Sequence, residues 1–216
     1  VHDPLLSGVE ALLACLWEGA QPLFRRPLAQ YGVVGTQRVT ALSQRPLAGY
    51  FADAMQVLGL DGIALFARPD AVTLVEILAT SPPSVVVHDS IESDLTALPY
   101  RVARALSLAT PIGVLVSSQD LERLETAIQS LHAAFGPPDA IGTVGREAAA
   151  LAAELWHTIP ARLQARMRDL LSGLTTPFDI DHAIACVDAM SARAGLVVCG
   201  TPSQALLSAH APSPAR

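Results

Sequence analysis

The chain has 216 residues, of which 51% are hydrophobic and only 5% aromatic, and its formal net charge is -6. A chain of this length can bury one domain, or one domain and a short additional helical element. All 14 basic residues are arginines scattered along the sequence, which argues against the basic stripe of a nucleic-acid-binding protein. No uninterrupted apolar run reaches the roughly 18–20 residues of a membrane span, so we expect none in this chain.

The first 45 residues predict a helix followed by an extended connection. Apolar residues recur at helical spacing over residues 4–19, and prolines and glycines punctuate residues 21–45. A helix over residues 46–58 follows, with a proline in its first turn. The chain begins at Val1 without an initiator methionine. We therefore expect residues 1–45 to be the end of an upstream helical array in a longer polypeptide.

Three short strands follow, over residues 62–67, 73–79 and 84–87. A turn at Arg68-Pro69-Asp70 separates the first two strands and predicts a hairpin between them. No crossover helix lies between the strands, so the sheet should be antiparallel or mixed. The sequence therefore predicts an α+β domain, predominantly helical, with a small three-stranded antiparallel or mixed sheet.

Most of the remaining sequence is helical in pattern. Pro111 and Gly113 are expected to break the first of these helices, and Ser117 and Ser118 to cap the second. A loop is predicted over residues 139–144. The predicted helices cover residues 99–109, 119–135, 146–158, 160–172, 179–198 and 202–209, and residues 211–216 are expected to be a frayed tail.

Neither the cysteines nor the histidines form a recognisable metal motif. Cys15, Cys186 and Cys199 are odd in number and widely spaced, which is typical of buried thiols in a reducing cytoplasm. No two histidines are three or four residues apart. A distant zinc site built from His88, His157 and His182 is an alternative. The G-x-S-x-G, P-loop and G-x-G-x-x-G signatures are absent.

Two segments together resemble a known family. Residues 84–109 run from a β-branched strand through a polar turn into a helix, and residues 188–196 read Asp-Ala-Met-Ser-Ala-Arg-Ala-Gly-Leu. This order resembles the gluzincin zinc peptidases of the HtpX and CAAX-prenyl-protease type, over roughly residues 46–200. In that family the first helix carries H-E-x-x-H and the later helix a glutamate ligand. The resemblance implies a zincin-like fold and a degenerate metallopeptidase-like domain over residues 46–210.

The resemblance places Arg104 and Leu108 at the two histidine positions, Ala105 at the glutamate base and Asp188 at the third ligand. A catalytic zinc needs three protein ligands and a base for its water, so we expect no metal and no other cofactor. We hypothesise instead that Arg104 fills the vacated ligand space and pairs with Asp188. The alternative is an ordinary arginine with its stem on the helix surface.

The sequence therefore predicts a non-catalytic, peptidase-like binding or scaffolding module with a protein or peptide partner. His88 and Arg193 are candidate residues of its cleft, although a turn histidine bonded to backbone is the alternative for His88. Domains of this kind resemble the C-terminal regions of bacterial tetratricopeptide-repeat proteins. Two further interpretations stay open. One is an active hydrolase, which would use either a relocated metal, as a metallopeptidase, or a Ser/His pair. The other is a small-molecule sensor.

Overall fold

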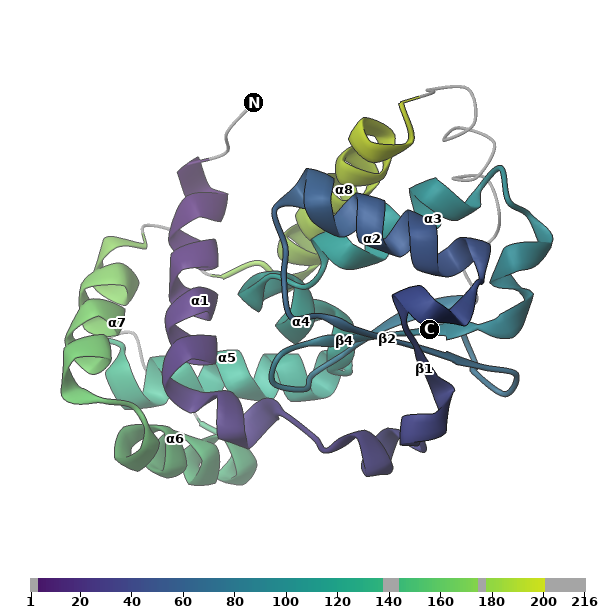
Figure 1. Cartoon of the computed structure of the whole chain (residues 1–216). Helices are drawn as coiled ribbons and strands as arrows, with labels where there is room; N and C mark the ends of the chain where they lie inside the picture. The colour runs from purple at the N-terminus through teal and green to yellow at the C-terminus, as the bar shows by residue number, and fades with distance from the viewer. Residues whose placement is uncertain (1–3, 138–143, 175–177, 201–216) are drawn as a thin grey trace. The chain divides into compact units, whose positions relative to one another are not determined.

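A computed structural model describes residues 4–137, 144–174 and 178–200, and its helices and strands are shown in Figure 1. The chain divides into two compact units. Unit 1 consists of residues 1–24 and 119–186, and unit 2 of residues 25–118 and 187–216. This division differs from the predicted boundary between residues 45 and 46, because the first helix groups with helices more than a hundred residues later.

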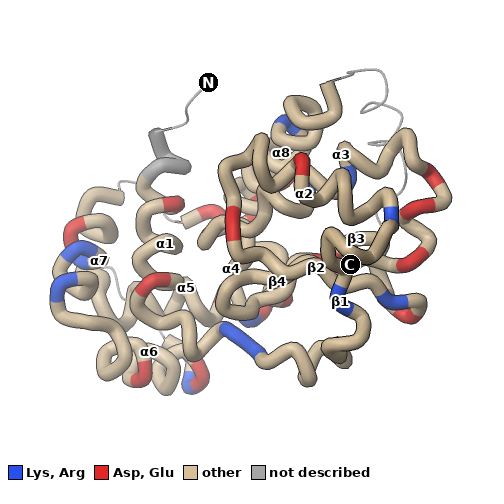
Figure 2. Tube along the Cα trace, viewed as in Figure 1, with Lys and Arg blue, Asp and Glu red and all other residues tan. Residues whose placement is uncertain are grey.

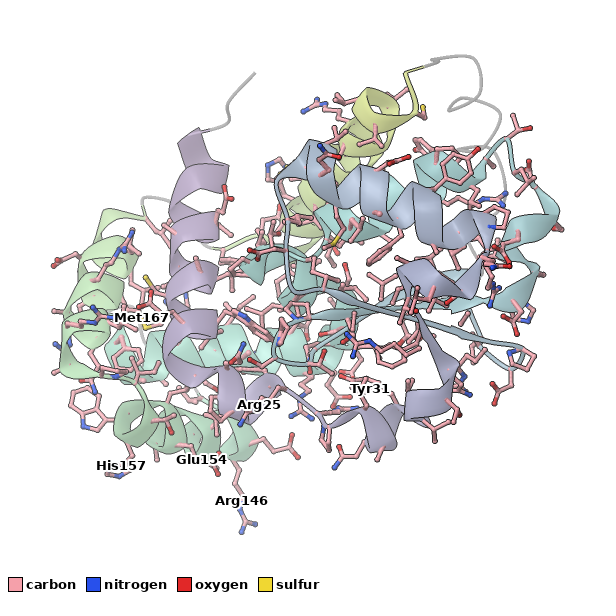
Figure 3. The ribbon with its side chains drawn as sticks, in the orientation of Figure 1. Arg25, Tyr31, Arg146, Glu154, His157 and Met167 are labelled. Carbon is pink, nitrogen blue, oxygen red and sulfur yellow. The ribbon has the colours of Figure 1, made fainter. Side chains whose placement is uncertain are left out.

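Unit 1 is helical in the part that the structure describes. Helix α5 packs on α6 and α7, and α1 packs on α7 and α6. Its interior consists of side chains such as Leu12, Leu16, Leu131, Leu155 and Met167, all fully buried, and Figure 3 labels Met167. The helices of unit 1 are α1 (Pro4–Phe24), α5 (Leu121–Phe135), α6 (Arg146–Thr158), α7 (Ala161–Gly173) and the beginning of α8 (Ile180–Cys199).

Unit 2 contains a four-stranded mixed sheet with the order β1-β2-β4-β3. Its strands are β1 (Arg38–Val39), β2 (Ala64–Arg68), β3 (Val75–Leu78) and β4 (Ser84–His88). Strand β4 runs parallel to β2 and antiparallel to β3, and β1 runs antiparallel to β2. The α+β class and the mixed sheet are confirmed. The two-residue strand β1 was not predicted, because two residues are too few to show an alternating pattern.

The predicted hairpin between β2 and β3 is wrong, since β4 lies between them. A central strand is buried on both faces, and a continuous apolar run suits that position. Val85, Val86 and Val87 supply such a run, and all three are buried. Strand β3 carries the exposed Glu76 and lies at the edge, joined to β4 as a hairpin instead.

Helices α2 (Pro46–Leu58) and α3 (Leu98–Ser107) pack against each other in unit 2, and α3 and α4 (Pro111–Ser118) also contact β3. Helix α4 corrects the prediction that Pro111 and Gly113 only break the helical pattern. Pro111 begins it, a position that tolerates proline. Gly113 lies so close to Leu108 that a Cβ there would be 2.5 Å from the Leu108 carbonyl oxygen.

Short 3-10 helices complete unit 2: η1 (Leu28–Tyr31), η2 (Gly35–Gln37), η3 (Ala41–Ser43) and η4 (Asp89–Ser93). The long helices agree with the predictions within one or two residues, except that α1 continues to Phe24 and contains a kink at Ala20. The N-terminal cap of α5 is Asp120, which accepts a hydrogen bond from the Arg123 N–H, rather than the predicted serines. The predicted helix over 202–209, the tail 211–216 and nearly all of the loop over 139–144 lie outside the described residues.

Among the described residues, α8 alone is long and apolar enough to cross a membrane by length and composition. The most apolar 18-residue stretch of this helix has a mean hydropathy of 1.4, and 22% of the stretch is buried. One such helix is weak evidence for a span. The expectation of no membrane span stays a prediction.

Candidate functional site

The two segments that resemble the peptidase motifs meet within unit 2. Tyr100 of α3 lies against Gly195 of α8, where an added Cβ would be 2.7 Å from two ring carbons of the tyrosine. One turn further along α3, Arg104 contacts Ser191, which lies one turn earlier on α8. The contacts therefore run in opposite senses along the two helices, which cross antiparallel at this point.

Arg104 lies between two groups of α8. Its Nε donates to Ser191 Oγ over 3.2 Å, and its Nη2 lies 3.5 Å from Asp188 Oδ1. Ser191 is buried and donates in turn to the backbone carbonyl of Asp188 over 2.8 Å. The ion pair that we hypothesised between Arg104 and Asp188 is thus present, and the arginine is not simply a free surface residue.

The strength of this pair is limited by solvent. The Arg104 and Asp188 side chains are 39% and 52% exposed. Pairs of this exposure contribute about 0–1 kcal/mol. The arrangement orients two helices weakly, and a guanidinium paired with a carboxylate is neither a metal ligand set nor a general base.

The other two residues that the resemblance aligns with H-E-x-x-H, Ala105 and Leu108, differ from Arg104 in their surroundings. Ala105 is buried in the interior of unit 2, with 4% of its surface exposed. Leu108 is the C-terminal cap residue of α3: its backbone N–H donates to the Ala105 carbonyl, and the next N–H, of Ala109, donates to the Leu106 carbonyl. The aligned base position therefore faces the core, and the second histidine position lies at the end of the helix.

His88 and Arg193 are not brought to the Arg104–Asp188 pair by any hydrogen bond or ion pair in the part of the chain that the structure describes. His88 caps η4: its Nδ1 accepts from the Ser90 N–H over 3.0 Å and lies 2.7 Å from Ser90 Oγ. The backbone-bonded turn histidine that we gave as the alternative is confirmed. Arg193 is exposed on α8.

The polar turn after β4 holds the start of α2. Glu92 Oε1 accepts from the Leu47 N–H over 2.9 Å, and Glu92 Oε2 accepts from Arg45 Nε over 2.8 Å. Arg45 also donates to Asp89 Oδ1 over 3.1 Å. Burial alone would raise the pKa of Glu92, but the hydrogen bonds from Arg45 and Leu47 outweigh it and lower that pKa. A carboxylate at a helix N-terminus satisfies a donor and the helix dipole together.

The histidines of the alternative zinc site belong to different units: His88 lies in unit 2, and His157 and His182 lie in unit 1. No group of three or more His, Cys, Asp or Glu side chains in the described residues could hold a metal ion. Glu154 and His157 are exposed on α6 and extend away from the ribbon (Figure 3). Acidic and basic residues are scattered over the described part of the chain and form no basic stripe in the view of Figure 2. Cys15 is buried as expected, but Cys186 and Cys199 are partly exposed.

No family model, curated protein or solved structure has significant similarity to the chain. The resemblance to gluzincin peptidases therefore rests on the sequence, and the zincin-like arrangement stays a prediction. Sequence reasoning did not find Ser191 or the contact between Tyr100 and Gly195. The signal was present as small or branched residues at intervals of four, Val187, Ser191 and Gly195, which share one face of α8.

Proposed function

We propose that the chain is a non-catalytic binding or scaffolding module built on a peptidase-like plan, with a protein or peptide partner. The observation that carries the proposal is the engagement of Arg104 by Asp188 and Ser191. In the aligned family, ligands from the same two helices converge on zinc. In this chain an arginine and a carboxylate converge on each other.

The chemistry of the pair supports a structural role. A guanidinium has five donors and no acceptor, so Arg104 can neither coordinate a cation nor accept a proton at neutral pH. Asp188 is one carboxylate, already paired. A hydrolytic zinc site needs three ligands, an open position and a base near the metal-bound water. A surface that recognises a partner needs none of these groups.

The peptidase-like plan can be tested by returning the ligands. If α3 and α8 keep the family's geometry, the variant R104H/L108H/D188E should bind Zn²⁺ at least about tenfold more tightly than the matched control R104H/L108H/D188A, because only the first variant has a third ligand at position 188. Isothermal titration calorimetry measures both Zn²⁺ affinities, and circular dichroism checks that both variants fold. Equal affinities would show that Asp188 is not at a ligand position and would remove the basis of the proposal.

The non-catalytic part needs its own test. The wild-type chain should release no product from a library of unstructured peptides. Tightly bound zinc that is lost in D188A, or peptide cleavage that stops when a chelator is added, would instead identify an active metallopeptidase.

A hydrolase with a Ser/His pair is the second candidate, because Ser90 Oγ lies 2.7 Å from His88 Nδ1. The same nitrogen accepts the Ser90 N–H, so the contact also serves the turn. Ester hydrolysis by the wild type that is abolished in S90A, with folding retained, would favour this candidate over the scaffold.

A further inference from the structure

Helix α8 carries a histidine and a cysteine one turn apart in unit 1. His182 Nε2 and Cys186 Sγ are 3.6 Å from each other. The two side chains are four residues apart, so they project from the same face of the helix. His182 is exposed and Cys186 is partly exposed, which leaves the pair accessible from solvent.

The separation of the two atoms matches a chelate. Zinc binds cysteine sulfur at about 2.3 Å and histidine nitrogen at about 2.0–2.1 Å, usually with tetrahedral angles. Two ligand atoms at those distances and a tetrahedral angle are about 3.6 Å apart. We propose that His182 and Cys186 form a two-point chelate for a thiophilic divalent ion such as Zn²⁺. This site is independent of the function proposed above, because that proposal rests on the contact of Arg104 in α3 with Asp188 and Ser191 in the later part of α8.

Binding follows simple ligand exchange. The Cys186 thiol gives its proton to solvent, the thiolate sulfur and the neutral His182 imidazole each form a bond to the metal, and two metal-bound waters leave. Water fills the remaining positions. Two protein ligands do not make the closed four-ligand site of a structural zinc, so the ion should exchange readily. This agrees with the absence of any three-residue ligand group among the described residues.

The chain provides its own control on the same helix. Cys199 is also partly exposed, and its Sγ contacts the carbonyl oxygen of Leu196 at 3.6 Å. The residue four positions before it is Gly195, which carries no ligand. Cys199 therefore has no ligand residue one turn earlier on α8, and it can be compared with Cys186 as a thiol outside the proposed chelate. Cys15, the third cysteine, is buried in unit 1.

Titration of the reduced full chain with Co²⁺ tests the proposal, because a thiolate ligand produces a charge-transfer band in the near ultraviolet. We expect the band in the wild type and in C199S, and its loss in C186S. Two linked ligands exceed either one alone by about 10²–10⁴ in affinity, so H182Q should weaken binding at least about 100-fold. Zn²⁺ should displace Co²⁺ and remove the band. Equal loss of the band in C186S and C199S, or no weakening in H182Q, would overturn the proposal.

Alkylation gives a second readout that does not depend on absorption. Saturating Zn²⁺ should slow the reaction of iodoacetamide with Cys186 while leaving Cys199 unchanged, and peptide mass mapping separates the two. If Zn²⁺ protects neither thiol, the close approach of sulfur and nitrogen is only a thiol–imidazole hydrogen bond and the proposal fails. Circular dichroism of C186S and H182Q checks that both variants fold.

Discussion

Replacing Gly195 by alanine tests the contact between α3 and α8. The new methyl carbon would lie 2.7 Å from Cδ2 and Cε2 of Tyr100 and 3.0 Å from its carbonyl oxygen. Carbon atoms prefer separations of about 3.5–4.0 Å, so the helices would have to move apart by nearly 1 Å. Tyr100 is 3% exposed and its carbonyl belongs to α3, so neither can move away easily.

The expected magnitude follows from two opposing terms. Overpacking of this kind costs about 1–3 kcal/mol. Alanine has the higher helix propensity, by about 0.8–1.0 kcal/mol, which opposes that cost. Gly195→Ala should therefore reduce the free energy of unfolding by up to about 2 kcal/mol. Gly49, on the exposed side of α2 in the same unit, has no atom within 4 Å of an added Cβ. Gly49→Ala should retain the propensity gain and stabilise by about 0.5–1 kcal/mol.

Urea unfolding followed by far-ultraviolet circular dichroism measures both variants, with the free energy obtained by linear extrapolation. A third variant, Y100L/G195A, removes the ring atoms that the methyl group meets. In the Y100L background, G195A should reduce the free energy of unfolding much less than it does in the wild type, which a double-mutant cycle measures. If G195A is stabilised as much as G49A, the close packing of α8 on α3 is not a feature of the folded chain.

Three further predictions concern charge. Glu92→Gln should cost about 1–3 kcal/mol at pH 7, because the Leu47 N–H loses a charged acceptor. The pKa of Glu92 is lowered from 4.5, so this contribution is complete above that value and is lost as the pH falls through the folded pKa. The free energies of unfolding of wild type and variant should therefore converge as the pH falls below 4.5 and through the folded pKa of Glu92, and a difference that stays constant with pH would contradict this reasoning. Asp188→Asn should cost less than about 1 kcal/mol, and about 1 M salt should abolish the difference; a larger, salt-independent loss would show that the pair with Arg104 is more than a surface ion pair. Burial lowers the pKa of His132 from 6.5, so stability should fall as the pH drops below that value; the same slope in His132→Gln would assign it to another group.

The helices of this chain were largely predictable because their signals are local. Proline at the start of α2 and Gly59 after its end mark that helix in the sequence, and Gly59 indeed has a positive φ of 65°. Helix α4 was missed because Gly113 counts against a helix locally. Its close approach to Leu108, which leaves no room for a Cβ, depends on the backbone path between α3 and α4 and cannot be read from residue types alone.

The order of the strands depends on which segment takes the central position in the sheet, and local sequence signals do not determine this. The Arg68-Pro69-Asp70 turn is a legitimate local signal for a hairpin. The structure instead has the apolar run Val85–Val87 in the centre of the sheet, where all three side chains are buried, and β3, with its exposed Glu76, at the edge. The Arg104–Asp188 pair was predictable from the family alignment, whereas Ser191, which joins them, is an unremarkable helical serine in the sequence.

The grouping of α1 with the later helices has a consequence for synthesis. Helix α1 leaves the ribosome before any of its packing partners, since α6 and α7 lie beyond residue 118. At bacterial and eukaryotic elongation rates of about 5–20 residues per second, the intervening segment takes on the order of 5–20 s to make. During that interval Leu12, Leu13 and Leu16 have no native neighbours to cover them. Apolar side chains of α1 therefore stay exposed on the nascent chain until residues 119–186, the second part of unit 1, have been made.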